Sequence, residues 1–428
     1  MRHAPIPQKL FIENRQRLAA RLSPNSLVVV HANDLLPANA DATLPMVANS
    51  DLFYLTGIEQ EETVLLLAPD AFDEKLREVL FVRETSDLLK VWEGAKHTKE
   101  EATKLSGIKT VKWLTELPVI LRGLMCEADH VYLNSNEHRR AVVEVETRDV
   151  RLARRLMHEH PLHDYRRLAP LMHELRVVKS PQEIELLKQA CAITRKGFLR
   201  VLKKTRPGRW EHEIEAEFAH EFIRHRARFA YTPIIAAGAN SNVLHYIAND
   251  QRMKQGNVLL LDVGASYANY NADLTRTIPV SGRFSRRQKQ VYNAVLRVTR
   301  AMIDAARPGV LHRDWQKQSQ ALMNEELLGL GLLKRSEIKK QDPDNPACRK
   351  YFMHGLGHPL GLDVHDVGIT SKPFAPGWVL TVEPGIYLPE EGFGVRLEND
   401  IEVTDGAPID LMADIPIEAD EIEDLMAK

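Results

Sequence analysis

The sequence predicts an α+β protein of two domains, an N-terminal α/β domain and a larger domain whose two halves repeat one plan. Helical and strand-like patterns alternate in residues 1–172, which is typical of a compact α/β domain. Farther along, Arg206-Pro-Gly208 recurs as Arg307-Pro-Gly309, each time between two helical segments. The length of 428 residues is sufficient for two domains with a core each. We expect the domains to span residues 1–172 and 173–428.

The elements of the first domain begin with a helix on which Phe11, Leu18 and Leu22 share one face, and which stops at Ser23-Pro24. Thr98-Lys-Glu-Glu101 has the form of a capping box and predicts a later helix. Strands are predicted from apolar runs at residues 27–30, 63–68, 79–82 and 131–133. The glycines are isolated and form no phosphate loop or dinucleotide fingerprint. We interpret the histidines of His158-Glu-His-Pro-Leu-His163 as part of a surface linker.

The second domain opens at Ser180-Pro-Gln-Glu183, which combines a good N-cap, a proline at the first helical position and a reciprocal glutamate. After Arg206-Pro-Gly208 an amphipathic helix carries Ile214, Phe218 and Phe222. Ser285-Arg-Arg-Gln288 caps the corresponding helix of the second half, and strands with acidic residues follow in each half. An internal duplication into two pseudo-symmetric halves explains this order, and chance recurrence of Pro-Gly at helix ends is the alternative.

Four carboxylates and one imidazole stand at the ends of, or within, apolar strand-like runs. Each residue alone is more often a turn former, a helix cap or a loop residue. Together they are too many charges for an ordinary core, because an ionised group away from water must be paired or bound to metal. Oxygen ligands with one nitrogen suit hard or borderline ions such as Mn²⁺. Two such ions roughly 3.5–4 Å apart can hydrolyse an amide. The five residues are Asp262, Asp273, His358, Glu383 and Glu398.

The segment around Glu398 alternates apolar and polar residues from Val395 to Val403. This period of two predicts a single strand with two unlike faces. Arg396 and Glu398 would then point the same way, so that a guanidinium lies beside a ligand carboxylate and orients it.

These motifs resemble the metal-dependent aminopeptidase P/prolidase group, whose catalytic domain has the pita-bread fold with a pseudo-twofold internal duplication. The five residues fall on the metal-ligand positions of that family. Asn49-Ser-Asp-Leu-Phe-Tyr-Leu-Thr-Gly57 and the run at 63–68 resemble the N-terminal domain of aminopeptidase P. The resemblance covers nearly the whole chain, although Pro45-Met-Val-Ala48 matches the family less closely than its surroundings do.

The resemblance implies roles for the individual residues. Asp262 chelates one metal ion, His358 and Glu383 hold the other, and Asp273 and Glu398 bridge them. Glu383 is then the acceptor of the proton from the attacking water. Histidine also donates hydrogen bonds to a developing oxyanion, and the family assigns three histidines to contacts with substrate and transition state. The predicted catalytic set is His245, His354, His365, Glu383 and Arg396.

The predicted activity is that of an Xaa-Pro aminopeptidase, which releases an N-terminal residue that precedes proline. A prolidase, restricted to Xaa-Pro dipeptides, is the main alternative. The residues 49–57 favour the aminopeptidase, and Gly357 in His354-Gly-Leu-Gly-His358 is at least as typical of prolidases. An inactive pita-bread domain that only binds partners is less favoured, because all five ligands are present. Creatinase-like hydrolysis shares the fold but not the full ligand set.

Composition agrees with these expectations. Lys and Arg number 57 against 59 Asp and Glu, so neither nucleic acid nor a membrane surface is indicated as a partner. Three scattered cysteines give no disulfide framework. The sequence contains no apolar run of the kind that marks a signal peptide or a membrane span, and we therefore expect a cytoplasmic protein. The family resemblance implies peptide substrates and a homodimer or homotetramer.

Overall fold

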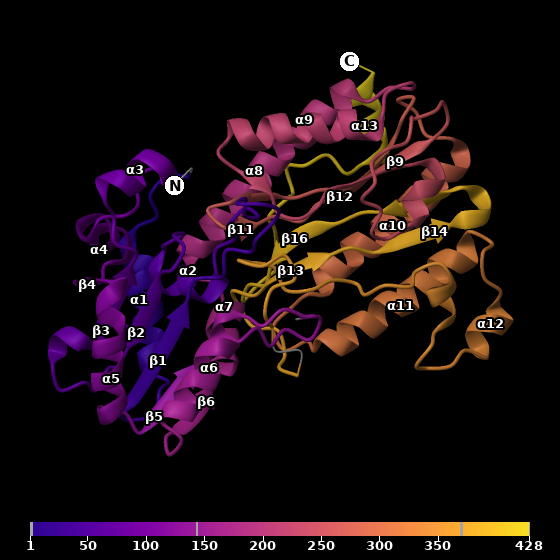
Figure 1. The fold of residues 1–428 in the computed structure, drawn as a ribbon. Coiled ribbons are helices and arrows are strands. Elements are labelled where there is room, and N and C mark those ends of the chain that lie inside the picture. The colour runs from indigo at the N-terminus through magenta and orange to yellow at the C-terminus, as the bar shows by residue number, and fades with distance from the viewer. Residues whose placement is uncertain (1–2, 143, 369–370, 428) are drawn as a thin grey trace. The chain divides into compact units, whose positions relative to one another are not determined.

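The structure is a computed structural model that describes residues 3–142, 144–368 and 371–427. The chain divides into two compact units, one that ends at Leu175 and one that begins at Arg176 (Figure 1). Each unit has its own sheets and its own hydrophobic core.

The first unit is built on a six-stranded mixed sheet in the order β4-β3-β2-β1-β5-β6. Its central strand β1 pairs antiparallel with β2 and parallel with β5. All six residues of β1 are buried, which requires cover on both faces of the sheet. Helices α5 and α6 pack on the face that contains Leu27 and Val29. The strands are β1 (Ser26–His31), β2 (Val64–Leu67), β3 (Glu78–Val82), β4 (Thr110–Trp113), β5 (His130–Leu133) and β6 (Asp164–Arg167); the helices are α1 (Gln8–Ala19), α2 (Ser50–Thr56), α3 (Asp87–Glu93), α4 (Lys99–Ser106), α5 (Leu117–Glu127) and α6 (Arg148–Glu159), with α7 (Ala169–Val177) at the junction of the units.

The capping box at Thr98 is present at the start of α4, and the four predicted strands correspond to β1, β2, β3 and β5. The first helix ends at Ala19, so that Leu22 lies beyond it and the predicted helix was too long. The linker interpretation is wrong for His158, which lies on the exposed side of the last turn of α6. Strands β4 and β6 went unpredicted because they are short and only partly apolar.

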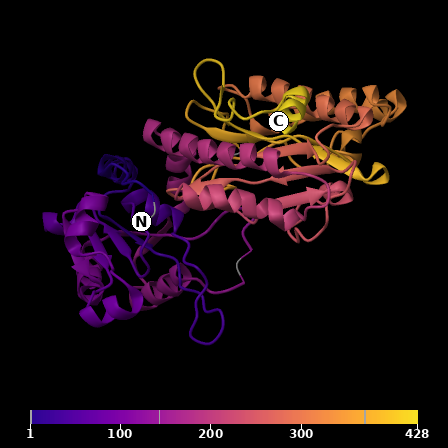
Figure 2. The same ribbon diagram turned by 90° about the horizontal axis from the view of Figure 1, so that it is seen from above.

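The second unit places its strands between two layers of helices, with α8 and α9 on one side and α10 and α11 on the other (Figure 2). Both Arg-Pro-Gly segments lie where the sequence predicts, after α8 and after α10, and each is followed by a second helix. The predicted capping boxes at Ser180 and Ser285 are both formed. The helices are α8 (Pro181–Lys204), α9 (Glu211–Arg224), α10 (Arg286–Ala305), α11 (His312–Gly329), α12 (Arg335–Lys339) and α13 (Ala419–Met426).

Two small sheets in this unit position the candidate acidic ligands, which lie in their strands or next to the ends of those strands. One has the order β12-β9-β8, and the other has the order β13-β16-β17. An isolated bridge between Thr275 and Glu398 joins them, so that strands from the two halves of the unit meet there. The strands are β7 (Arg228–Phe229), β8 (Ile234–Ala237), β9 (Val258–Asp262), β10 (Ala265–Tyr267), β11 (Tyr270–Asn271), β12 (Thr275–Pro279), β13 (Val379–Val382), β14 (Gly385–Leu388), β15 (Phe393–Arg396), β16 (Asn399–Glu402) and β17 (Ile409–Asp410).

The single strand predicted from Val395 to Val403 is wrong in one respect, because it is interrupted at Leu397-Glu398. The part before the break, β15, pairs with β14, and the part after it, β16, pairs with β13. Arg396, Glu398 and Asp400 are buried like the apolar residues of the run, and among its polar residues Glu402 is partly exposed. Arg396 and Glu398 still lie on one side, because both contact the hydroxyl of Thr275.

No helix within residues 3–142, 144–368 and 371–427 has the length and apolar character that a membrane span requires.

Candidate metal centre

Asp262 and Asp273 meet because β9 and β12 pair antiparallel, with Asp262 opposite Thr275. Gly264 allows this close approach, since a Cβ atom on it would lie 1.7 Å from the carbonyl oxygen of Ala272. The hydroxyl of Tyr231 lies 2.5 Å from one oxygen of each aspartate. A phenol has one proton to donate, so the two carboxylates share a space that suits a cation better than it suits two negative charges.

His358 and Glu383 come from the second half of the unit. The segment of His358 pairs with Thr381, whose hydroxyl accepts the His358 backbone N–H at 3.1 Å. His358 Nδ1 is 3.0 Å from the carbonyl oxygen of Pro359, so Nδ1 carries the proton and Nε2 presents its lone pair. That Nε2 atom lies 3.6 Å from Asp273 Oδ2 and 3.7 Å from Glu383 Oε1.

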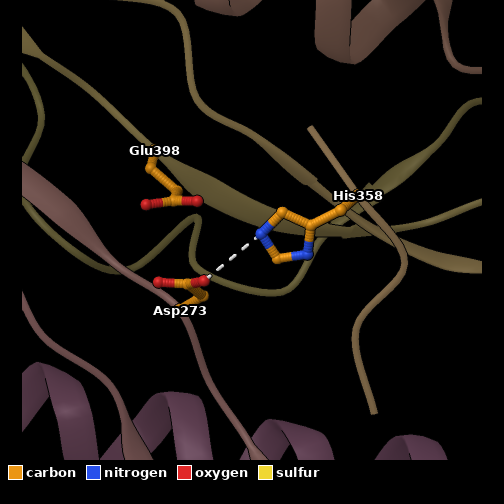
Figure 3. Close-up of side chains that lie close together, drawn as sticks. All are labelled: Asp273, His358 and Glu398. Atoms are coloured by element: carbon orange, nitrogen blue, oxygen red, sulfur yellow. Dashed lines mark ion pairs between the residues drawn. The ribbon is translucent and has the colours of Figure 1, made fainter. Parts of the chain in front are cut away.

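Asp273, His358 and Glu398 form the centre of the site. One potential ligand atom from each residue lies within 4.8 Å of those of the other two, and all three residues are buried. Figure 3 shows the two carboxylates and the imidazole turned toward one another from three separate segments. Three ligand atoms at this spacing around a common point are an arrangement that a single divalent ion can bridge.

The electrostatics of the centre favour a bound cation. Burial, followed by the nearby Asp262 and Asp400, raises the pKa of Asp273 well above its ordinary value. Burial, followed by Asp273 and Glu383, raises the pKa of Glu398 in the same way. Without cations these carboxyls bind their protons more tightly than they would in water, because ionised carboxylates repel one another in a buried site. The donor set of carboxylate oxygens and one imidazole fits hard or borderline divalent ions.

Arg396 is buried against this group and forms an ion pair with Asp262 Oδ2. Its Nη1 donates to the hydroxyl of Tyr387 at 2.9 Å, and its Nε donates to Thr275 Oγ1 at 3.2 Å. Thr275 in turn donates to Glu398 Oε2 at 2.7 Å. The guanidinium therefore orients candidate ligands on both sides of the site, directly at Asp262 and through Thr275 at Glu398.

The three remaining histidines differ in their surroundings. His354 Nδ1 lies 2.8 Å from the carbonyl oxygen of Gly355, and its Nε2 lies 2.7 Å from the hydroxyl of Tyr387. Burial, followed by Arg396, lowers the pKa of His354 to about 3, so its ring is neutral. His365 is exposed, and its ring centroid lies 4.3 Å from that of His358. His245 is also exposed, and its charge contributes to the low pKa of His354.

Comparison with known proteins places this geometry in a family. The model of metallopeptidase family M24 matches residues 185–405, and that of the aminopeptidase P N-terminal domain matches residues 11–132. The Xaa-Pro aminopeptidase of Haemophilus influenzae is 34% identical to this chain, over 99% of this chain and 98% of the relative. The Xaa-Pro aminopeptidase of Escherichia coli is 35% identical, over 98% of each chain. The chain belongs to metallopeptidase family M24.

The fold of this metallopeptidase agrees with that assignment. Zinc-substituted aminopeptidase P of Escherichia coli in complex with product superposes with a TM-score of 0.86 and 33% identity, over 99% of both chains. The predicted family, the α+β class with a pita-bread catalytic domain, and the predicted function of a metal-dependent Xaa-Pro aminopeptidase are thereby confirmed.

Sequence reasoning did not identify Thr275, Tyr231 and Tyr387, whose hydroxyls contact side chains of the candidate ligands or catalytic residues. Thr275 carried a usable signal, because it stands two positions after Asp273 and so lies on the same side of an extended segment. Tyr231 and Tyr387 carried none, since each reaches the site by tertiary packing from a segment with no metal-ligand spacing.

Proposed function

We propose that this chain removes the N-terminal residue from peptides that carry proline in second position, with two divalent ions, Mn²⁺ in the cell, at the site. The convergence of Asp273, His358 and Glu398 carries the proposal, because three ligand atoms within 4.8 Å of one another bring a buried imidazole and two buried carboxylates to one point. Peptides with N-terminal Xaa-Pro are then the substrates.

The proposed ligand assignment follows the positions of the five side chains. Asp262 would hold one ion and His358 with Glu383 the other, and Asp273 and Glu398 would serve as ligands to both. Three distances support this division: Asp273 Oδ2 is 3.6 Å from His358 Nε2, and the Tyr231 hydroxyl is 2.5 Å from an oxygen of Asp262 and 2.5 Å from an oxygen of Asp273. Asp273 thus lies between the other aspartate and the histidine, as a bridging ligand must.

The mechanism assigns separate tasks to the chain's own groups. When bound, the ions supply a water of lowered pKa and polarise the scissile carbonyl. Glu383, 3.7 Å from His358 Nε2 through its Oε1, accepts the proton of the attacking water. Arg396 holds the carboxylate of Asp262 in place. His245 and His365, both exposed, donate hydrogen bonds to the oxygen that gains charge. His354, neutral and held by Tyr387, contacts the substrate beyond the cleaved bond.

We further propose that residues 1–172 form the aminopeptidase P-like domain and residues 173–428 the catalytic domain. The family matches at 11–132 and 185–405 lie within these bounds. A cytoplasmic location and a homodimer or homotetramer complete the proposal. The sequence alone left prolidase activity open, because Gly357 in His354-Gly-Leu-Gly-His358 is at least as typical of prolidases; the two relatives described above are Xaa-Pro aminopeptidases and favour the first activity.

A peptide panel tests the proposal. A prolidase must recognise the free carboxylate of proline, so a longer substrate leaves a buried cation unpaired and is discriminated against by about 10² or more. An aminopeptidase has no such requirement. We expect an Xaa-Pro-Xaa tripeptide to be cut at least as well as the matching Xaa-Pro dipeptide, and an Xaa-Ala-Xaa tripeptide far more slowly. A strong preference for the dipeptide in kcat/KM would assign the chain to the prolidases and leave its metal site unchanged.

A further inference from the structure

The carboxylate of Glu211, in the first turn of α9, is buried and accepts four hydrogen bonds. Its Oε1 accepts from the backbone N–H of Ala237 at 2.7 Å and from the side chain of Asn240 at 3.3 Å. Its Oε2 accepts from the hydroxyl of Tyr246 at 2.7 Å and from the backbone N–H of Gln251 at 2.9 Å. A buried carboxylate with this many donors has a defined position, because each lost bond leaves a polar group unpaired.

The four donors belong to one segment, residues 237–251, which leaves β8 and carries His245. Ala237 stands at its entry and Gln251 at its exit, so one carboxylate fixes both ends. The backbone closes the segment on α9 as well, since Glu211 N donates to the carbonyl oxygen of Gln251 at 3.0 Å.

Around His245 the side chains alternate in direction. Leu244 and Tyr246 pack on a small apolar cluster of β8, β9 and Tyr387, whereas Val243 and Ile247 are 53% and 60% exposed. His245 shares the exposed side, where apolar packing does not hold it. Burial and the hydrogen bond to Glu211 raise the pKa of Tyr246, which stays protonated and remains a donor. The contact between Tyr246 and Glu211 therefore holds the backbone on the C-terminal side of His245 in place.

We infer that Glu211 is a positioning residue for His245: its carboxylate holds the 237–251 segment so that the imidazole faces the metal centre. The inference rests on the catalytic role proposed above for His245. A catalytic group displaced by about 1 Å can lower the rate by as much as 10². Glu211 itself acts on the reaction only through the segment that it holds.

Glu211→Gln is the variant that tests this inference. Glutamine keeps the size of the side chain but turns one acceptor oxygen into an N–H₂ donor, which faces the existing donors of the segment. We expect kcat to fall roughly tenfold, with little change in KM and with full metal content by elemental analysis. The matched control is Glu217→Gln on the same helix, which loses an ion pair to Arg200 at 2.6 Å and does not contact the segment; its kcat should stay within about twofold of wild type.

A double-variant cycle decides whether the effect passes through His245. If it does, Glu211→Gln added to His245→Ala causes no further loss of kcat. A further loss as large as in the single variant, or a loss of metal from Glu211→Gln, overturns the inference. His245→Ala with wild-type kcat refutes the proposed role of that histidine, and this failure is visible in the single variant. If Glu211→Gln does not fold by circular dichroism, Tyr246→Phe takes its place in the same cycle with the same expected outcomes.

Discussion

Thr275 shows how one hydroxyl can serve a charged site. It accepts a hydrogen bond from Arg396 Nε at 3.2 Å and donates one to Glu398 Oε2 at 2.7 Å. The hydrogen bond donated to Glu398 orients its carboxylate, and the hydrogen bond accepted from Arg396 fixes the direction of the Thr275 hydroxyl proton. A group that orients a metal ligand without touching the metal commonly changes affinity by 10–100-fold when it is removed.

We predict that Thr275→Val weakens metal binding by roughly 10–100-fold, because valine has the same shape and neither donates nor accepts. Activity at limiting Mn²⁺ should fall, and excess Mn²⁺ should restore most of it. Titration of the metal-free protein by calorimetry measures the affinity. Thr275→Ser keeps the hydroxyl and should bind nearly as wild type does. Equal affinities for the valine and serine variants would show that the hydroxyl has no such role.

A second prediction separates proposed ligands from proposed helpers. Asp273→Ala or Glu398→Ala removes a bridging carboxylate, so metal content and rate should fall together. His365→Ala and His245→Ala should keep their metal and lose roughly 10²–10³ in kcat, the scale for one oxyanion donor. Elemental analysis beside steady-state kinetics provides both readouts. Loss of metal from His365→Ala would show that this histidine is a ligand or supports one.

The residues of the site were predictable from sequence to different degrees. The proposed ligands stand in motifs that contain too many charged residues for an ordinary core. This excess of charge can be recognised from the sequence alone. The role of Tyr231 could not be predicted from the sequence, because its contact with Asp262 and Asp273 arises only when separate strands pack together. Nor does the sequence indicate that His365 is exposed while His354 is partly buried, since both stand in similar glycine-rich surroundings.

At the scale of elements, capping boxes and apolar periodicity predicted helices such as α8 and α10 well, because both signals are local. The break between β15 and β16 was not predicted. Alternation of polar and apolar residues normally indicates a strand with one solvent-exposed face, whereas here Arg396 and Glu398 line a buried site. The break lets Arg396 end one hairpin and Asn399 begin another sheet, with Glu398 at the junction.

Gly357 provides a test of how the elements hold His358. A Cβ atom there would lie 2.0 Å from the carbonyl oxygen of Thr381, so Gly357→Ala must push the His358 segment away from β13. We expect lost metal content and a lower melting temperature, since backbone shifts that relieve overpacking are destabilising by about 1–3 kcal/mol. Gly355→Ala is the control, because its Cβ would meet only Gln316 at 3.7 Å. Similar melting temperatures and metal contents for the two variants would contradict this account.

At the scale of the whole molecule, the site concentrates negative charge inside the second unit. Asp273, Glu398 and Asp400 are each buried, and burial raises the pKa of each well above its ordinary value. Asp400 accepts the backbone N–H of Asp273 at 3.0 Å, which ties it to the same group. The metal-free fold therefore binds protons at these carboxyls that the unfolded chain releases near pH 4.

The sign of the resulting pH dependence follows from linkage. Because the folded pKa values are raised, these groups lower the free energy of unfolding of the metal-free protein as pH rises above about 4 toward those values. Divalent ions that replace these protons offset the fall in the free energy of unfolding. They bind only to deprotonated ligands, so their affinity decreases as the pH is lowered. We therefore expect the stabilisation by metal to be large at pH 8 and to shrink as pH falls toward 5.

Thermal unfolding with and without Mn²⁺ measures this difference. An ion at a hundred times its dissociation constant adds about 2.7 kcal/mol per site, or roughly 5–10 °C in Tm for a unit of this size. The shift should appear with Mn²⁺, vanish with a chelator, and be smaller at pH 5.5 than at pH 8. Asp273→Asn keeps the size of the side chain but removes one of the proposed bridging charges, so its Tm should respond weakly to metal at both pH values. A shift of equal size at both pH values in the wild-type protein would mean that the ion binds away from the buried carboxylates, because only a site that exchanges protons for metal loses affinity in acid.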